Sequence, residues 1–241
     1  MTRFLKWLLP CLLVGGLTPV YVSAFQFSPL SQEIVLDRVR PSVNYTVQNT
    51  TESPIAVQIR AFTREIDPDG SEVNEPVGDT IHIYPSQMIL RPGDIQVVRV
   101  RWSGSTDIER GRAYRIVAEQ VPVDLDQEEQ EGSTLLRMVL RYSSTLFVQP
   151  PEAEPELTVL SVVPANDSDQ SYLVTIRNDG TGYARLDEGV LVLYYRGLQE
   201  EIPWTEIEEV AGHTIPPGVV REFTVSGIPF TPEGGRVSSG G

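Results

Sequence analysis

The stretch that decides the fold is TLLRMVLRYSSTLFVQPP, residues 134–151, in which apolar side chains recur at every second position. Leu136, Met138 and Leu140 fall on one face of an extended chain, and two arginines fall on the other. Successive side chains of a β-strand point to opposite faces, so a period of two predicts one long strand. A strand of this kind needs a partner for its apolar face.

Similar runs continue outward in both directions, separated by turn signals such as DPDG (67–70) and RPGD (91–94), where Pro sets φ and Gly accepts positive φ. Before residue 134 the predicted strands are 42–49, 54–65, 80–85, 87–90, 94–102 and 112–123, and after it they are 157–163, 171–178, 189–197 and 219–225. No convincing helical period of 3.6 is present. Many short strands at this spacing predict an all-β protein made of antiparallel β-sandwiches.

Composition divides residues 25–241 into two domains. QPPEAEPE (149–156) carries three prolines and three glutamates, which predicts a boundary between an N-terminal domain, 25–150, and a smaller C-terminal domain, 151–241. The Gly-rich ending, 232–241, is expected to be frayed, which would leave the second domain short of an edge strand.

Residues 1–24 read as a secretory signal peptide. They combine a basic start (Arg3, Lys6), an apolar run and a small-residue cleavage pattern that ends near Ala24. The run is shorter than the roughly 20 residues of a membrane span, so cleavage is preferred over a retained anchor. The only cysteine, Cys11, lies inside this segment. The mature protein is therefore expected to be exported, soluble and free of thiols.

Charge and motifs argue against several classes of protein. The net charge of −14 is unfavourable for binding nucleic acid. No nucleotide-binding or hydrolase motif is present, and neither His82, expected on an outer strand face, nor His213 has a metal-ligand neighbour. The acidic clusters at 124–131 and 200–209 lack calcium-loop spacing and are interpreted as solvated. We therefore expect no catalytic residues, no metal, no cofactor and no enzymatic activity.

Four segments of the first domain, in order, resemble the periplasmic pilus chaperones, the PapD-like family. They are VNYTVQNTTESPIAVQIRAF (43–62), IYPSQMILRPGDIQVVRVRW (83–102), AYRIVAEQVPV (113–123) and LLRMVLRYSSTLFVQPP (135–151). The start of the mature chain, FQFSPLSQEIVL (25–36), looks like the first strand of the archaic-type branch. The resemblance implies two immunoglobulin-like domains, a periplasmic location, and pilus subunits and an outer-membrane usher as partners. Self-association that caps exposed edges is also expected.

The family's activity offers a partner for the apolar face of the opening stretch. Pilus subunits lack the last strand of an immunoglobulin-like fold, and the chaperone supplies a strand of its own, which is donor-strand complementation. Leu136, Met138 and Leu140 match the family's donor positions. Alternatively, these three side chains face the core of their own domain.

The family also holds the subunit's C-terminal carboxylate between two basic residues, one on the first strand and one on the last strand of domain one. The matching positions here are Thr145 and a residue near Ser31–Glu33, and neither is basic. Either Arg141, on the same strand face as Thr145, compensates, or Ser31, Ser144 and Thr145 donate neutral hydrogen bonds; a missing anchor is the third possibility.

Two other functions remain open at this point. One is a two-domain immunoglobulin-like structural or adhesive module, which would bury the three apolar side chains internally. The other is a secreted hydrolase with acidic residues between its domains.

Overall fold

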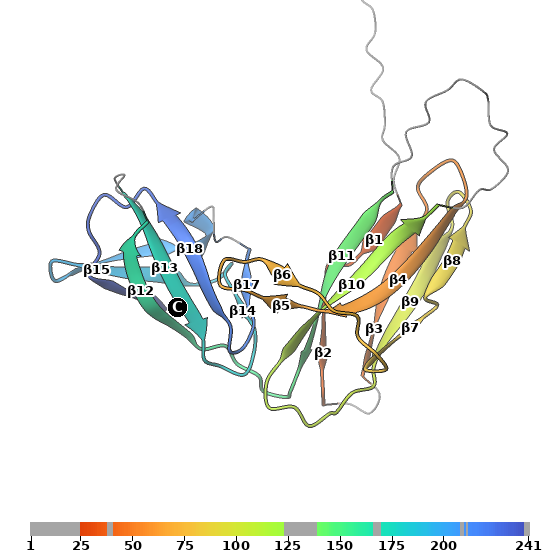
Figure 1. Ribbon diagram of the computed structural model, residues 1–241, viewed down its shortest axis with the longest axis horizontal. Helices are drawn as coiled ribbons and strands as arrows, with labels where there is room; N and C mark the ends of the chain where they lie inside the picture. Colours follow the sequence, from red (N-terminus) through yellow and green to blue (C-terminus); the bar gives the residue numbers. More distant parts are fainter. Residues whose placement is uncertain are drawn as a thin grey trace, which may run out of the picture.

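The computed structural model describes residues 25–37, 41–122, 139–165, 170–207, 210 and 212–238. Within these ranges the regular structure is β-strand, apart from one short 3₁₀ turn, η1 (Trp204–Glu206). Figure 1 shows two β-sandwiches that meet at an angle. The all-β prediction is therefore confirmed. No helix in the described ranges is long and apolar enough to cross a membrane.

The N-terminal sandwich packs two sheets face to face. The four-stranded sheet has the order β1 (Gln26–Ser28), β3 (Ser42–Gln48), β9 (Ile95–Trp102) and β7 (Ile81–Tyr84). The five-stranded sheet has the order β2 (Ser31–Val35), β11 (Arg141–Gln149), β10 (Arg112–Val121), β4 (Ile55–Thr63) and β8 (Gln87–Leu90). The expected antiparallel pairing holds except between β2 and β11, which are parallel.

Two segments of the N-terminal domain switch from one sheet to the other, and a proline marks each switch. Pro29 separates β1 from β2, and Pro85 separates β7 from β8. Proline has no backbone N–H to give to a ladder, so it ends the pairing on one side before the chain crosses. The first switch leaves β2 only five residues long.

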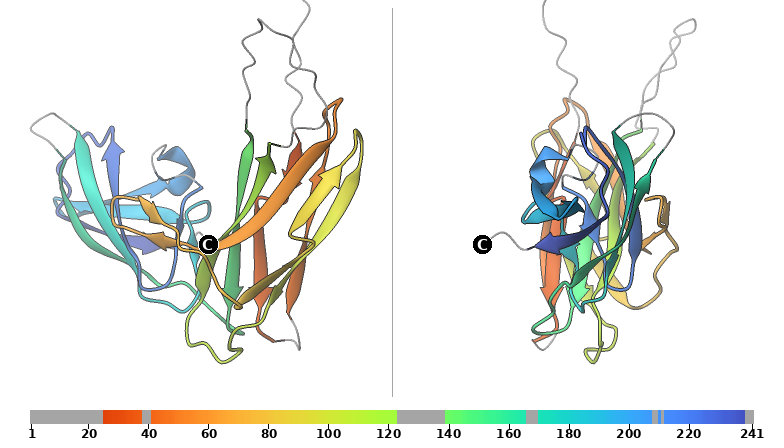
Figure 2. Two further views of the ribbon diagram at one scale, coloured as in Figure 1. Left: turned by 45° about the vertical axis from the view of Figure 1, so that its right-hand side comes forward. Right: turned by 90° about the vertical axis from the view of Figure 1, so that its left-hand side faces the viewer.

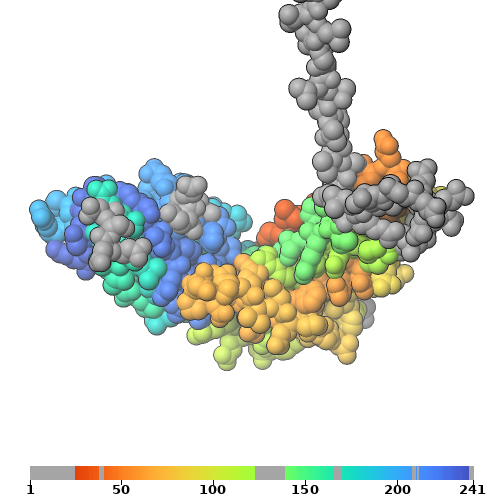
Figure 3. Space-filling view, turned by 45° about the horizontal axis from the view of Figure 1, so that its top comes forward, coloured from red at the N-terminus to blue at the C-terminus, as the bar shows by residue number. Residues whose placement is uncertain are grey.

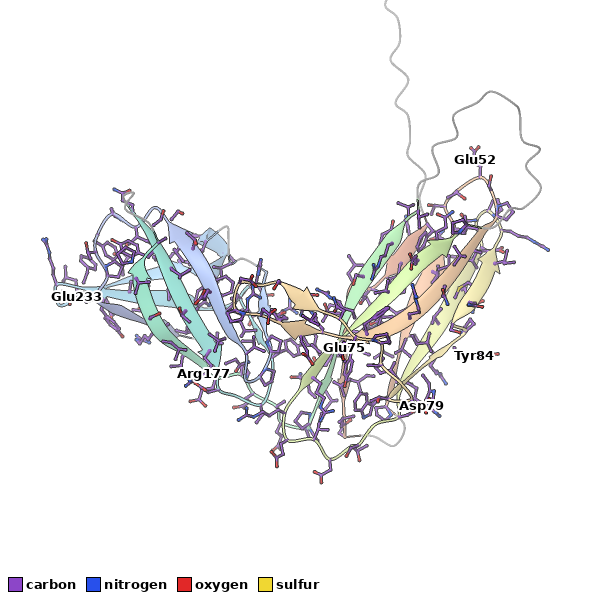
Figure 4. All side chains as sticks on the ribbon, viewed as in Figure 1. Glu52, Glu75, Asp79, Tyr84, Arg177 and Glu233 are labelled. Carbon is purple, nitrogen blue, oxygen red and sulfur yellow. The ribbon has the colours of Figure 1, made fainter. Side chains whose placement is uncertain are left out.

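One contiguous core fills the space between these sheets. Its fully buried members include Phe25, Tyr45, Val98, Ile116 and Leu146, each from a different part of the chain. Apart from Phe25, which precedes β1, they lie at inward-facing positions of their strands, as the period of two predicts. Opposite positions face solvent, and Tyr84 projects outward from β7 with 82% of its surface exposed (Figure 4). The side chain of His82 is also exposed, as expected.

The C-terminal sandwich has a separate core. One sheet has the order β12 (Leu157–Pro164), β13 (Ser171–Asn178) and β18 (Val220–Ser226), and the other has the order β16 (Leu198–Pro203), β15 (Val190–Tyr195) and β19 (Gly234–Ser238). A two-stranded ladder joins β14 (Ala184–Arg185) to β17 (Thr214–Ile215). Trp204, Ile176 and Leu191 are among the fully buried residues of this second core.

Two expectations for the C-terminal domain were wrong. Residues 234–238 are not frayed, because β19 pairs with β15 and supplies the edge strand that the domain was expected to lack. Glycine has a low strand propensity, but Gly235 approaches the Val192 carbonyl so closely that a Cβ would lie 3.0 Å from it.

The acidic cluster at 200–209 begins within β16, where Glu200 and Glu201 are exposed.

The two cores are linked by residues 149–156, where the sequence predicted a boundary. Gly180 allows the linker to pass close by, since a Cβ there would lie 2.3 Å from the Glu154 carbonyl oxygen. Phe147 stacks on Tyr183 with ring centroids 3.7 Å apart, and the Tyr183 hydroxyl donates to Glu33 at 3.0 Å. These contacts join β11 and β2 of the first domain to the second.

Candidate functional site

Strand β11 has a free backbone edge along its first half. Its β10 partners run from Glu119, opposite Arg141, to Arg112, opposite Val148. On the other side, β2 begins only at Ser31, opposite Thr145. Among the described residues, positions 141–144 therefore have a ladder partner on one side only. An unpaired row of N–H and C=O groups is a template for adding another strand.

The two faces of β11 have different surroundings. Leu146 and Val148 are fully buried in the domain core, and Ser144 points the same way, donating to the Tyr45 hydroxyl at 3.4 Å. Burial is the main reason that the pKa of Tyr45 is raised to about 12. The structure therefore directs Ser144 into the core and away from the face that carries Thr145.

Of the three apolar side chains expected to act as donors, the structure describes only that of Leu140. Leu136 and Met138 lie outside the described residues. Leu140 immediately precedes β11, is partly buried and packs against the domain core. Leu140 thus covers the end of its own core, as the alternative reading expected for all three residues. The donor role of these residues stays a prediction.

The remaining face of β11 borders a cationic hollow of about 320 Å³. Its lining residues come from β4, β6 (Glu72–Val73) and its following residue, β10 and β11, and they are Phe62, Glu72, Asn74, Arg115, Val117, Arg141 and Ser143. Arg115 lies opposite Thr145 in the β10–β11 register, and its Nη1 donates to the Thr145 hydroxyl at 2.6 Å. Ser31 lies opposite Thr145 on the other side. The fold therefore gathers Arg115, Thr145 and Ser31 on adjacent strands, and Arg115 lines the hollow together with Arg141.

Arg115 was missed in the sequence analysis. Its signal is a single arginine between the apolar residues Tyr114 and Ile116 in the strand RAYRIVAEQVPV. Placing it beside Thr145 requires the register of β10 against β11, which are far apart in the sequence. Spacing along the chain does not supply that register.

Glu72 balances part of the charge in this hollow. Its carboxylate accepts hydrogen bonds from Arg115 and from Arg64, which follows β4. Burial alone would raise the pKa of Glu72, but the hydrogen bonds and charges of the two arginines outweigh burial and hold the pKa below its ordinary value. Glu72 is therefore ionised, and the cluster of three side chains keeps a net positive charge.

A second hollow, of about 630 Å³, lies beside the interdomain linker and is lined by Gln149, Tyr183 and Trp204 among others. It does not include the free half of β11. In the described part of the chain, no three His, Cys, Asp or Glu side chains are grouped so as to hold a metal ion.

Comparisons with known proteins agree with this architecture. A family model described as "Pili and flagellar-assembly chaperone, PapD N-terminal domain" matches residues 27–154. No match was found among curated protein sequences.

Solved structures share the fold at low sequence identity. A chain of the CsuC–CsuE chaperone–tip adhesion subunit complex of Acinetobacter baumannii is 16% identical, with a TM-score of 0.57, and the match covers 85% of this chain and 88% of that one. The class 5 fimbriae chaperone CfaA is 13% identical (TM-score 0.56, 90% and 98% covered). A chain of the SafA pilin–SafB chaperone complex of Salmonella enterica is 14% identical (TM-score 0.54, 92% and 98% covered).

Proposed function

The chain belongs to the family of pili and flagellar-assembly chaperones, and on this premise we propose that it binds incomplete immunoglobulin-like pilus subunits by donor-strand complementation. The first half of β11, together with the residues that precede it, is the strand that it lends. The mechanism needs no cofactor and no catalytic step, because the unfinished fold of the subunit supplies the driving force.

The free edge of β11 is the observation that carries this proposal. Residues 141–144 have no ladder partner on the side away from β10 within the described chain, so their backbone is available to a subunit strand. Leu136 and Met138 continue the same alternation toward the N-terminus. Each would fill a pocket of the subunit's groove, and burying such a side chain contributes roughly 1.5–3 kcal/mol.

The cationic hollow is proposed to receive the subunit's C-terminal carboxylate. Arg115 supplies the charge, and the hydroxyls of Thr145 and Ser31, which lie on adjacent strands, supply neutral donors. Arg141 lines the same hollow and would guide the carboxylate toward it. Charge-assisted hydrogen bonds of this kind are about twice as strong as neutral ones.

We further propose that the protein acts in the periplasm and that its partners are pilus subunits and an outer-membrane usher. Residues 1–24 would direct export to the periplasm and be removed near Ala24. Two of the similar solved structures are complexes of a chaperone with a pilin or a tip subunit, which supports pilus subunits as the partner class. Delivery to an outer-membrane usher, and self-association that covers the free edge of β11, complete the proposal.

Co-expression in a bacterial periplasm tests the proposal. A pilus subunit that lacks its last strand exposes an apolar groove, so alone it should aggregate or be degraded. With this protein, its soluble yield should rise several-fold and the two chains should co-purify. Equal soluble yield with and without the protein would favour the alternative, an immunoglobulin-like structural or adhesive module.

A further inference from the structure

A small hairpin of the N-terminal domain reaches across to the C-terminal domain. It consists of β5 (Glu65–Ile66), β6 and the DPDG turn, and it continues directly from β4. Figure 2 shows it alongside the second sandwich, and Figure 3 shows its surface bridging the two domains. Its base is closed by Thr63, whose N–H donates to the carbonyl of Glu75, labelled in Figure 4.

The tip of this hairpin contacts β18 of the second domain. The N–H of Glu222 donates to the Pro68 carbonyl at 2.8 Å. Gly70, with φ of +91°, lies against the guanidinium of Arg221, and a Cβ there would be 2.5 Å from its Nη2. Arg221 is only 5% exposed. The hairpin is therefore held by the second domain and is not free in solvent.

Side chains of the hairpin region join the second domain to Arg115 in one chain of hydrogen bonds. The first link is Arg64, whose Nη1 donates to the Thr214 hydroxyl of β17 at 3.2 Å and whose Nε donates to Glu72 at 2.8 Å. Glu72 then accepts from Arg115, with Nε at 2.9 Å from Oε2. The exposed fractions of the Arg64, Glu72 and Arg115 side chains are 10%, 22% and 20%, so water screens these contacts only in part.

The geometry at Arg115 is that of a guanidinium held from one side. Its Nε and Nη2 are occupied by Glu72, and its Nη1 is directed to Thr145. Within the described residues, one N–H on each of Nη1 and Nη2 has no acceptor. A side chain with four rotatable bonds would otherwise sample many orientations, so the bidentate contact selects the one that faces Thr145.

We propose that Glu72 is a positioning residue that orients Arg115 toward the subunit's C-terminal carboxylate. Glu72 lies on the β5–β6 hairpin and is held by Arg64, which is bound in turn to Thr214 of the second domain. Recognition of the carboxylate therefore depends on the docked second domain. The inference rests on the proposed function, in which Arg115 binds that carboxylate. In this arrangement the C-terminal domain contributes to recognition indirectly: it does not contact the carboxylate, but it holds the side chains that orient Arg115.

The test compares two forms of one recombinant pilus subunit that binds the wild-type protein, one with its natural C-terminal carboxylate and one with a C-terminal amide. The quantity measured is the ratio of the two dissociation constants. In the wild type the carboxylate form should bind at least about tenfold more tightly, as expected for a charge-assisted hydrogen bond. A general loss of folding lowers both affinities and leaves the ratio unchanged, so the ratio reports on positioning.

Glu72→Gln is expected to reduce this ratio to within about threefold of unity, because a neutral amide no longer holds Arg115. Thr214→Val, which is distant from the hollow, should reduce the ratio about twofold to threefold by freeing Arg64. Glu119→Gln is the matched control, since Glu119 pairs with Arg60 at 2.7 Å on the same sheet face but does not touch Arg115. It should leave the ratio unchanged.

The outcomes separate this inference from the proposed function. If Arg115→Gln keeps the full ratio, Arg115 is not the anchor and the proposed carboxylate site fails. If Arg115→Gln abolishes the ratio while Glu72→Gln preserves it, the anchor stands and the positioning role is overturned. If Glu72→Gln lowers the ratio and Thr214→Val does not, the dependence on the second domain is overturned.

Discussion

A Leu136→Glu, Met138→Glu variant should lose at least about 100-fold in affinity for a pilus subunit while remaining folded. Two buried apolar contacts of roughly 1.5–3 kcal/mol each disappear. In addition, two carboxylates would have to be desolvated in the subunit's groove, at several kcal/mol. Every 1.4 kcal/mol is about a factor of ten in affinity, so 100-fold is a lower bound. Co-purification from the periplasm and titration of the purified partners both measure the loss.

This pair of substitutions avoids Leu140, which packs against the core of its own domain, so that a charge there would confuse binding with folding. Val139→Glu is the matched control. Its side chain is 49% exposed and has the opposite parity to Leu136 and Met138, so affinity should change by less than about threefold. If the double variant unfolds, as judged by its thermal transition, those side chains belong to the domain core and the structural-module reading leads.

Arg115→Gln should weaken binding of a subunit with a free C-terminal carboxylate by about 10- to 100-fold, the range for hydrogen bonds to a charged group. Stability should change little, because Glu72 keeps its ion pair with Arg64 at 2.8 Å and is not left as an unpaired buried charge. Salt should weaken the wild-type complex more than that of the variant, since the wild type brings Arg115 as well as Arg141 to the carboxylate.

Arg60→Gln provides the comparison for Arg115→Gln. Arg60 lies on β4 of the same sheet and pairs with Glu119, but its side chain is 51% exposed, and exposed pairs contribute only about 0–1 kcal/mol. Its loss should leave subunit affinity within about twofold of wild type. Equal weakening by both variants would mean that general surface charge, and not a defined carboxylate site, draws the subunit.

Side-chain periodicity was sufficient to predict most strands of the first domain. β3, β4, β9 and β10 lie within the predicted runs because half of each strand faces one core, and the resulting period of two is visible in the sequence. The predicted strand 134–151 appears from Arg141 onward, with residues 123–138 outside the described chain. Local propensity was misleading at β19, where two glycines are held in a strand by pairing with β15.

The candidate site was predicted less well because it depends on contacts between distant residues. The family resemblance implied that Thr145 and Ser31 lie near one another, and these two residues pair between β11 and β2. It did not identify Arg115, Glu72 or Arg64, which come from three different segments. These three side chains come into contact because of the strand register and the docking of the β5–β6 hairpin on the second domain. Side-chain periodicity along the sequence predicts neither of these.

The central claim is that the free edge of β11 pairs with a strand of the subunit, and amide hydrogen exchange measures this most directly. In the free protein, at a concentration where it is monomeric, amides among residues 141–144 that point away from β10 should exchange rapidly, whereas amides of 146–148, which lie between β10 and β2, should be protected. On binding a pilus subunit, the amides at the free edge should become protected by at least about tenfold, and those of 146–148 should change little. A stable complex in which residues 141–144 gain no protection would contradict donor-strand complementation by β11.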